Sequence, residues 1–333
     1  MSAMTRFGNR LYTGETSINF IGRRVTWYIV SATIIVLSVA FTVLRGGFTF
    51  GIEFRGGSEF QVSNPASVDT SIAEKTVLDG VGVTAAPKIS IVGGSSVRVQ
   101  TDQLTTEQTD ALRASLATAY NVPVEKVTSS FIGASWGSDI TGQALRALGI
   151  FLVLVSIVMA LYFRTWKMSV AAIVAVVHDL VITAAVYGAL GLEVTPAAVI
   201  GLLTILGYSL YDTVVVFDKI RENTSVAYDE SKRSFAQSVN LAVNQTLVRS
   251  INTSIVAALP VSSILFIGSM LLGAGTLRDI ALSLFVGIIC GAYSTIFIAA
   301  PLYAQLREGE SESTKQGRKV RTEIVRNASG AVR

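Results

Sequence analysis

The sequence predicts a polytopic α-helical membrane protein with six transmembrane helices and one small α+β domain between the first and second helices. Half of the 333 residues are apolar, only 15% are charged and the mean hydropathy is +0.54, values typical of integral membrane proteins. Apolar runs of about 20 residues, which match a hydrocarbon core of about 30 Å, recur along the chain. A long polar stretch with its own strand and helix patterns separates the first run from the others.

The apolar runs predict six spans, at residues 25–44, 143–163, 168–191, 195–217, 250–272 and 280–304. The first run is long and no small-residue cleavage site follows it directly. We therefore expect it to be a membrane anchor and not a cleaved signal peptide.

The distribution of Lys and Arg predicts the orientation. Four of them precede the first span, five lie between Lys219 and Arg249, and seven follow Gln305, whereas the connection from Gly191 to Thr195 has none. Basic residues collect on the cytoplasmic side of membrane proteins. We therefore expect a cytoplasmic N-terminus (1–24), a cytoplasmic connection (218–249) within the five-helix region 143–304, and a cytoplasmic tail (305–333) whose polar composition predicts disorder.

In this topology the polar stretch 45–142 is external. Its patterns predict strands at 58–62, 88–92, 97–101 and 126–132 and helices at 68–78 and 105–120. This β-α-β-β-α-β order is typical of a ferredoxin-like sandwich.

Two glycine pairs punctuate this domain. Gly93-Gly94 predicts a hairpin, and Gly56-Gly57 predicts a tight bend where the chain leaves the first span. Neither pair has the strand-to-helix context or the following lysine of a phosphate-binding loop.

The strongest candidate functional residue is Asp212, a carboxylate inside the apolar fourth span. An ionised side chain costs several kcal/mol at such a position, so ionisable residues within membrane spans usually have a function. Thr204, Tyr208 and Asp212 recur every four positions, so they share one helix face. Counted from Pro196 at about 1.5 Å per residue, Asp212 lies about 24 Å along the helix axis, in the cytoplasmic half of the membrane.

On the fifth span, Gln245, Arg249, Asn252 and Thr253 share a face near the same depth. Arg249 is the natural partner for Asp212, since a carboxylate paired with a guanidinium can stay ionised at low dielectric. Opening such a pair would let the carboxylate take up a proton, the elementary step of a proton relay. A static ion pair that fixes helix packing fits the spacing equally well.

His178-Asp179 on the third span forms a second polar position, about 15 Å from the cytoplasmic end of its helix. The chain has one histidine and one cysteine, Cys290, too few for a zinc site or an intramolecular disulfide. No serine has a nucleophile-elbow context. The remaining roles are an accessory relay or helix-helix hydrogen bonding.

Two further patterns concern packing. Gly287 and Gly291 on the sixth span form a small-xxx-small pattern, which allows two helices to approach closely. Four apolar residues before the fifth span recur at helical spacing and predict a helix lying along the cytoplasmic surface: Phe235, Val239, Val243 and Leu247.

Five long motifs resemble one family over nearly the whole chain. They are GIEFRGGSEF from Gly51, VVHDLVIT from Val176, GYSLYDTVVVFDKIREN from Gly207, TLVRSINTS from Thr246, and LRDIALSLFVGIICGAYSTIFIAAPL from Leu277. Their order and their places in the spans are similar to those of the SecF branch of the SecD/SecF family, which is related to the resistance-nodulation-division superfamily.

The resemblance implies a non-enzymatic subunit of the Sec translocase in the bacterial plasma membrane. Its partners would be SecD, the SecYEG channel and YajC, the translocating polypeptide and membrane lipids, with no nucleic acid. With SecD, it would use the proton motive force to assist translocation after insertion driven by SecA and SecYEG. Protons would be the coupling ion, with no other cofactor, and the relay would use the residues that match here, Asp212 and Arg249.

The resemblance also assigns an external-domain motif to Gly51, Glu53, Phe54, Gly56 and Gly57. Relatives commonly read GIDFTGG, so Glu53 and Arg55 depart from the pattern, as does Tyr211 where many relatives have Asn. These departures limit what can be carried over to those positions.

Three other functions stay open at this stage. A stand-alone proton-coupled exporter of lipids or small molecules would share the helical architecture, although a single small external domain offers little room for a substrate channel. An intramembrane enzyme around His178 and Asp179 would need a nucleophile or second ligand that the sequence does not offer. A scaffold without proton coupling would tolerate neutralisation of Asp212.

Overall fold

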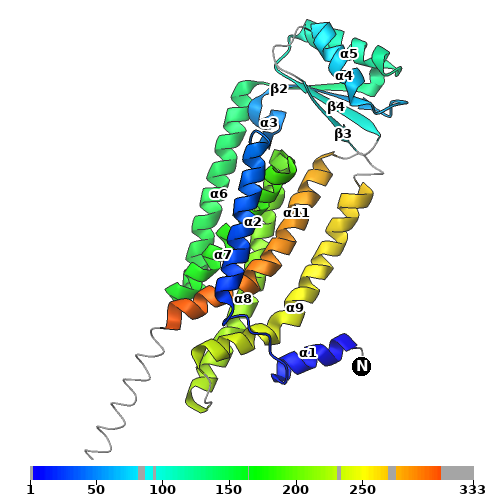
Figure 1. Ribbon diagram of the computed structural model, residues 1–333. Coiled ribbons are helices and arrows are strands. Elements are labelled where there is room, and N and C mark those ends of the chain that lie inside the picture. Colours follow the sequence, from blue (N-terminus) through cyan, green and yellow to red (C-terminus); the bar gives the residue numbers. More distant parts are fainter. Residues whose placement is uncertain are drawn as a thin grey trace, which may run out of the picture.

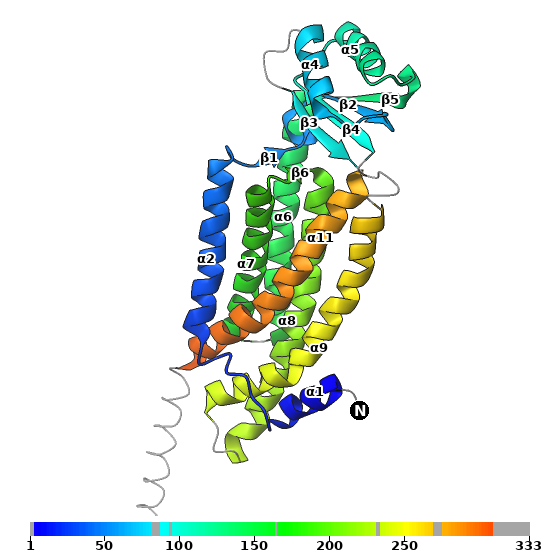
Figure 2. The ribbon, with the colours of Figure 1, turned by 45° about the vertical axis from the view of Figure 1, so that its right-hand side comes forward.

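The computed structural model describes residues 3–81, 87–92, 95–163, 165–230, 234–268 and 275–308. A bundle of long helices carries a small α+β domain at one end and the short helix α1 (Ala3–Thr13) at the other (Figure 1). The last described helix ends on the same side as α1 (Figure 2). Of the predicted disordered tail, residues 305–308 are helical and the rest lies outside the described residues.

Among the described residues, six helices are long and apolar enough to cross a membrane, which confirms the predicted number. They are α2 (Arg24–Leu44), α6 (Ala134–Phe163), α7 (Trp166–Leu190), α8 (Pro196–Glu230), α9 (Phe235–Ser263) with the π-helical turn η2 (Ile264–Gly268), and α11 (Gly275–Ser294), which continues through the π-helical turn η3 (Thr295–Ala299) to Glu308.

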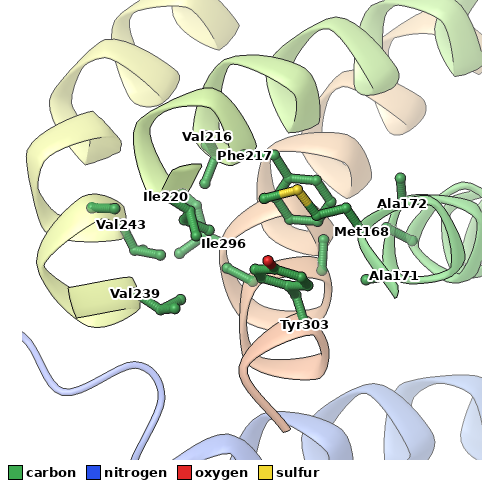
Figure 3. Packing of buried hydrophobic residues seen from close by; sticks show 14 of the residues in the cluster. Met168, Ala171, Ala172, Val216, Phe217, Ile220, Val239, Val243, Ile296 and Tyr303 are labelled. Carbon is green, nitrogen blue, oxygen red and sulfur yellow. The ribbon is translucent and has the colours of Figure 1, made fainter. Parts of the chain in front are cut away.

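The bundle has inner and outer helices. About half of the apolar window of α7, α8 and α11 is buried, against 11% or less for α2, α6 and α9. Near the α1 end, α7 contributes small side chains such as Ala171 and Ala172, and the large rings of Phe217 and Tyr303 fill the space that they leave (Figure 3). Alanines allow a close approach of helices, which dispersion contacts then stabilise.

The α+β domain confirms the predicted β-α-β-β-α-β order. Its elements are β2 (Gly57–Ser63), α4 (Thr70–Val81), β3 (Lys88–Val92), β4 (Ser96–Thr101), α5 (Thr106–Ala119), η1 (Val124–Lys126) and β5 (Val127–Ile132).

The sheet order is β3-β4-β2-β5 with every pair antiparallel, as in a ferredoxin-like sandwich. The helices α4 and α5 cover the sheet face that points away from the bundle (Figure 2). A capping box between Thr105 and Gln108 begins α5. The predicted Gly93-Gly94 hairpin falls outside the described residues, although Val92 and Ser96 on either side of it pair.

The junction between domain and bundle was not predicted. The two-residue strand β1 (Thr49–Phe50) pairs in parallel with β6 (Glu193–Val194), which precedes α8, and the one-turn helix α3 (Ile52–Arg55) follows β1. The bend at Gly56-Gly57 is confirmed, with φ values of 78° and 141°. A Cβ atom on Gly57 would lie 2.5 Å from the carbonyl oxygen of Thr101, so only glycine fits there.

The predicted helix that contains Phe235, Val239, Val243 and Leu247 is present, and the structure corrects only what its apolar face contacts. The residues concerned form the first half of α9, which runs across the end of the bundle before turning along it (Figures 1 and 2). Phe235, Val239 and Val243 are buried against α8 and Tyr303 (Figure 3). The apolar face therefore packs on the bundle and not on lipid. The predicted connection 218–249 consists largely of the ends of two long helices.

Candidate functional site

Asp212 lies on α8 and is nearly enclosed, with 5% of its surface exposed. Its Oδ1 accepts a hydrogen bond of 2.9 Å from the Ser250 hydroxyl on α9. Its Oδ2 has no hydrogen-bond partner among the described residues. The site is a buried carboxylate held by one neutral donor, with one oxygen atom unsatisfied.

Arg249, the expected partner, is the residue before Ser250, and its side chain is exposed. Consecutive residues of a helix point about 100° apart, so only one of the two can face Asp212 directly. No ion pair within 4.0 Å joins Arg249 to Asp212 in the described part of the chain, whereas Ser250 contacts the carboxylate. Sequence reasoning missed Ser250, although its position next to Arg249 is a visible signal.

The other predicted residues on this side of α8 and α9 are less enclosed. The hydroxyls of Thr204 and Thr253 bond to carbonyl oxygens of their own helices, at Ile200 and Arg249, and Tyr208 is half-buried. Four of the exposed polar side chains of these two spans are called here the open polar face: Thr204, Tyr211, Arg249 and Asn252.

A second polar cluster lies between α7 and α8. Asp179 on α7 is 1% exposed, and its Oδ2 accepts a hydrogen bond of 2.5 Å from Ser209 on α8. Its Oδ1 lies 3.4 Å from Nδ1 of His178. The His178 ring stacks on Tyr293 of α11, with ring centres 6.0 Å apart. We call Asp179, His178 and Ser209 the Asp179 cluster.

The predicted packing glycines lie where α11 meets α8. A Cβ atom on Gly287 would approach Ile205 to 2.5 Å, and one on Gly291 would approach Ser209 to 2.9 Å. These glycines let the two helices come together at the depth of the Asp179 cluster.

The external-domain motif forms the junction with the bundle. Glu53 on α3 is largely enclosed and burial raises the pKa of its carboxyl group, since an ionised form is costly away from water. Its Oε2 has no hydrogen-bond partner among the described residues. Phe54 packs close to α6, because a Cβ atom on Gly137 would lie 2.5 Å from the Phe54 carbonyl oxygen.

Charged side chains link the sheet to this junction. Arg98 on β4 lies 3.6 Å from Glu59 and 3.4 Å from Glu193, which lies on β6. Gln100 donates to Glu193 at 2.7 Å. Lys88 lies 4.0 Å from Glu193, and burial lowers the pKa of its amine. These contacts tie the domain to the loop between α7 and α8.

The described residues contain no group of three or more His, Cys, Asp or Glu side chains that could hold a metal ion. The chemistry that the two membrane sites can support is proton binding by buried carboxylates.

The sequence matches two models of known protein families. Residues 112–309 match the family model of the protein export membrane protein SecD/SecF, C-terminal, and residues 45–63 match the SecD/SecF GG motif. The chain belongs to the SecD/SecF family. This confirms the resemblance read from the five sequence motifs.

Individual relatives place the chain in the SecF branch of the SecD/SecF family. It is 43% identical over 333 residues to protein translocase subunit SecF of Streptomyces coelicolor, covering 100% of this chain and 87% of that protein. It is 42% identical over 331 residues to SecF of Mycobacterium tuberculosis, covering 96% and 71%. Membership of the SecF branch gives the chain an accessory role in the Sec translocase.

A solved structure agrees with the fold. SecDF of Thermus thermophilus, described as a translocon-associated membrane protein, matches with a TM-score of 0.77 and 30% identity, over 88% of this chain and 39% of that one. In that relative a SecF-like part and a longer remainder share one polypeptide, which supports association of SecF-type chains with SecD.

Proposed function

We propose that this SecF-branch chain, together with SecD, couples proton flow to protein translocation across the bacterial plasma membrane. The observation that carries the proposal is the Asp212 carboxylate, buried within a membrane-spanning helix with one neutral donor and one unsatisfied oxygen atom. An ionised carboxylate without a cation is costly in such surroundings. The charge of this site, and with it the stability of the surrounding helices, therefore changes when Asp212 gains or loses a proton.

The neighbouring residues Ser250 and Arg249 supply two alternative partners for Asp212. Ser250 donates one hydrogen bond to the carboxyl group. A rotation of α9 by about one residue, about 100°, would bring Arg249 to the same position. The guanidinium would favour the ionised carboxylate, so exchange between the two partners would couple proton release to movement of α9.

The open polar face supports SecD as the partner of this chain in the membrane. Arg249 and Asn252 are exposed within a membrane-spanning helix. Polar side chains in a membrane are costly when they face lipid and normally face protein or water. A helix of SecD laid over this face would satisfy them and would enclose the Asp212 site.

The wider assembly follows the same reasoning. Basic residues at both ends of the chain favour cytoplasmic termini and an external α+β domain. The proposed partners are SecYEG, YajC and the emerging polypeptide, which the external domain would assist after its insertion by SecA. The gradient would supply the energy, without an enzymatic step or a bound cofactor.

Export of a reporter protein in cells whose only copy carries Asp212→Asn tests the proposal. We expect gradient-dependent export to fall about 100-fold, in line with the loss of a positioned proton carrier, while expression and SecD association stay normal. Asp218→Asn is the matched control, since Asp218 lies on the same helix and bonds to Tyr162, away from the proposed site. Unchanged export with Asp212→Asn would contradict the proposal.

A further inference from the structure

Asp179 is a second deeply buried carboxylate that the proposed step at Asp212 does not use. Asp179 lies near the middle of α7 and is 1% exposed. Among the six described spans, α7, α8 and α11 have the largest buried shares. A carboxylate at such a position is expensive to keep ionised. It therefore needs either a compensating charge or a proton.

The compensating group available to Asp179 is His178. Within the described residues, the ion pair closest to Asp179 is the one to Nδ1 of His178 at 3.4 Å, and no Lys or Arg nitrogen lies within 4.0 Å. The other facing groups are Ser209 from α8 and, from α11, Cys290 and Tyr293. The pair is uncharged only when it holds one proton in addition to that of neutral imidazole.

One nitrogen atom of His178 is free to exchange that proton. When Nδ1 donates to Asp179, Nε2 becomes an acceptor, and Nε2 is buried without a hydrogen-bond partner among the described residues. The Tyr293 ring that stacks on the imidazole is itself fixed, since its hydroxyl accepts from Ser31 and donates to the Trp27 carbonyl of α2. Nε2 therefore has a free lone pair on a ring of fixed orientation, and it can bind a proton that reaches it.

Ser209 connects the Asp179 cluster to the helix that carries Asp212. Its hydroxyl donates to Asp179 Oδ2 at 2.5 Å, and it precedes Asp212 by less than one helical turn. Gly291 provides the space, because a Cβ atom there would lie 2.9 Å from that of Ser209. Thus α8 contacts one buried carboxylate with Ser209 and carries the other.

We propose that Asp179 and His178 form a second proton-binding site, held in place by Ser209, that works with Asp212 in the coupling step. A proton enters at Nε2 of His178 while the proton on Nδ1 passes to Oδ1 of Asp179. Neutral imidazole and a neutral carboxylic acid result, and the pair changes from one negative charge to none. Release reverses both transfers. This second site rests on the proposed function of Asp212, and Ser209 acts in it as a positioning residue.

Infrared difference spectroscopy of the purified chain with SecD in lipid nanodiscs tests the second site. Spectra between about pH 5 and about pH 8, where folded proteins are usually most stable, should contain one signal from Asp179 and one from Asp212. Asp179→Asn should remove one and Asp212→Asn the other. The matched control is Asp139→Asn, at an exposed position of α6, which should remove neither.

Further variants keep the test decisive if Asp179→Asn does not fold. His178→Gln and Ser209→Ala retain the carboxyl group and should shift the midpoint of its signal. An Asp179→Asn spectrum identical to the wild-type spectrum, or midpoints unchanged in both other variants, would overturn the second site. The readout does not depend on export, so normal export by Asp212→Asn would refute the proposed function and leave this result standing.

Discussion

The two sides of α8 differ in how completely this chain encloses them. Toward α7 and α11, glycines allow close packing and the Asp179 cluster is sealed within the chain. Toward α9, Asp212 is buried by its immediate neighbours, but the residues around it are open, with Tyr211 56% exposed and Arg249 and Asn252 exposed as well.

This chain alone therefore completes one of the two buried carboxylate sites, that of Asp179. The closed side is enclosed by helices of this chain. The open side leaves polar groups at a depth where lipid cannot satisfy them, so a second subunit is expected to complete it.

Gly287→Leu should disrupt the closed side most strongly. The new side chain would collide with Ile205 of α8, since even a Cβ atom comes within 2.5 Å of it. We expect a loss of about 3 kcal/mol in the free energy of unfolding, as for overpacked cores. The control is Gly207→Leu on the other side of α8, where a Cβ atom meets nothing within 4 Å. Equal unfolding midpoints for the two variants in detergent would show that the closed side is not tightly packed.

Asn244→Ala should weaken the attachment of the N-terminal segment to the first half of α9, where Asn244 is buried. The Asn244 amide accepts from the Ile18 nitrogen at 2.8 Å and donates to the Ile18 oxygen at 2.9 Å. Its loss leaves the part-buried Ile18 nitrogen without this acceptor, while the Ile18 oxygen keeps a hydrogen bond of 3.0 Å from Asn240, so we expect a cost of about 1.5 kcal/mol. Asn252→Ala, at an exposed position of the same helix, should cost almost nothing. Thermal unfolding and proteolysis of the N-terminal segment measure both, and equal effects would contradict the distinction.

Arg249→Gln should leave the isolated chain stable and weaken its association with SecD. The side chain is exposed, so we expect a change in stability within about 0.5 kcal/mol. Loss of an interface arginine should weaken binding of SecD about tenfold. Quantitative co-purification from membranes checks this, with exposed Arg221→Gln on α8 as the control. Unchanged binding would mean that SecD does not cover the open polar face.

Glu53→Gln tests the junction outside the membrane and should have the smallest effect. Burial raises the pKa of Glu53 above its usual value of 4.5, so the folded protein binds this proton more tightly than the unfolded chain does. The stabilisation is fully present below about pH 4.5 and is lost as the pH rises through the higher folded value. Thermal unfolding should therefore become less dependent on pH in Glu53→Gln. An identical pH dependence in both proteins would show that Glu53 is not buried at the junction.

The sequence predicted what local patterns determine. Six apolar runs and the alternation of short strands and helices account for the spans and for the sheet order, because each depends on neighbouring residues. The pairing of β1 with β6 was missed, since each strand has two residues and they lie far apart in the chain. The burial of Phe235 and Val239 was also missed, because an apolar helical face looks alike whether it packs on lipid or on protein.

The sequence was limited in the same way for individual side-chain contacts in the candidate site. The sequence identified Asp212 and the correct region of α9, because a carboxylate in an apolar run is conspicuous. Helical spacing alone could not decide whether Ser250 or Arg249 faces it, since that depends on the rotation of α9 by one residue. Likewise, the contact of Ser209 with Asp179 requires the close approach of helices that Gly291 permits.

Proton entry into liposomes that contain the chain with SecD and SecYEG would show whether Asp212 carries protons across the membrane. A pH-sensitive dye inside the liposomes reports the flux when a gradient is imposed and a polypeptide is being translocated. We predict that wild-type protein and Asp218→Asn admit protons and that Asp212→Asn admits none above the lipid background. Proton entry with Asp212→Asn equal to that of the wild type would contradict Asp212 as the proton-carrying residue.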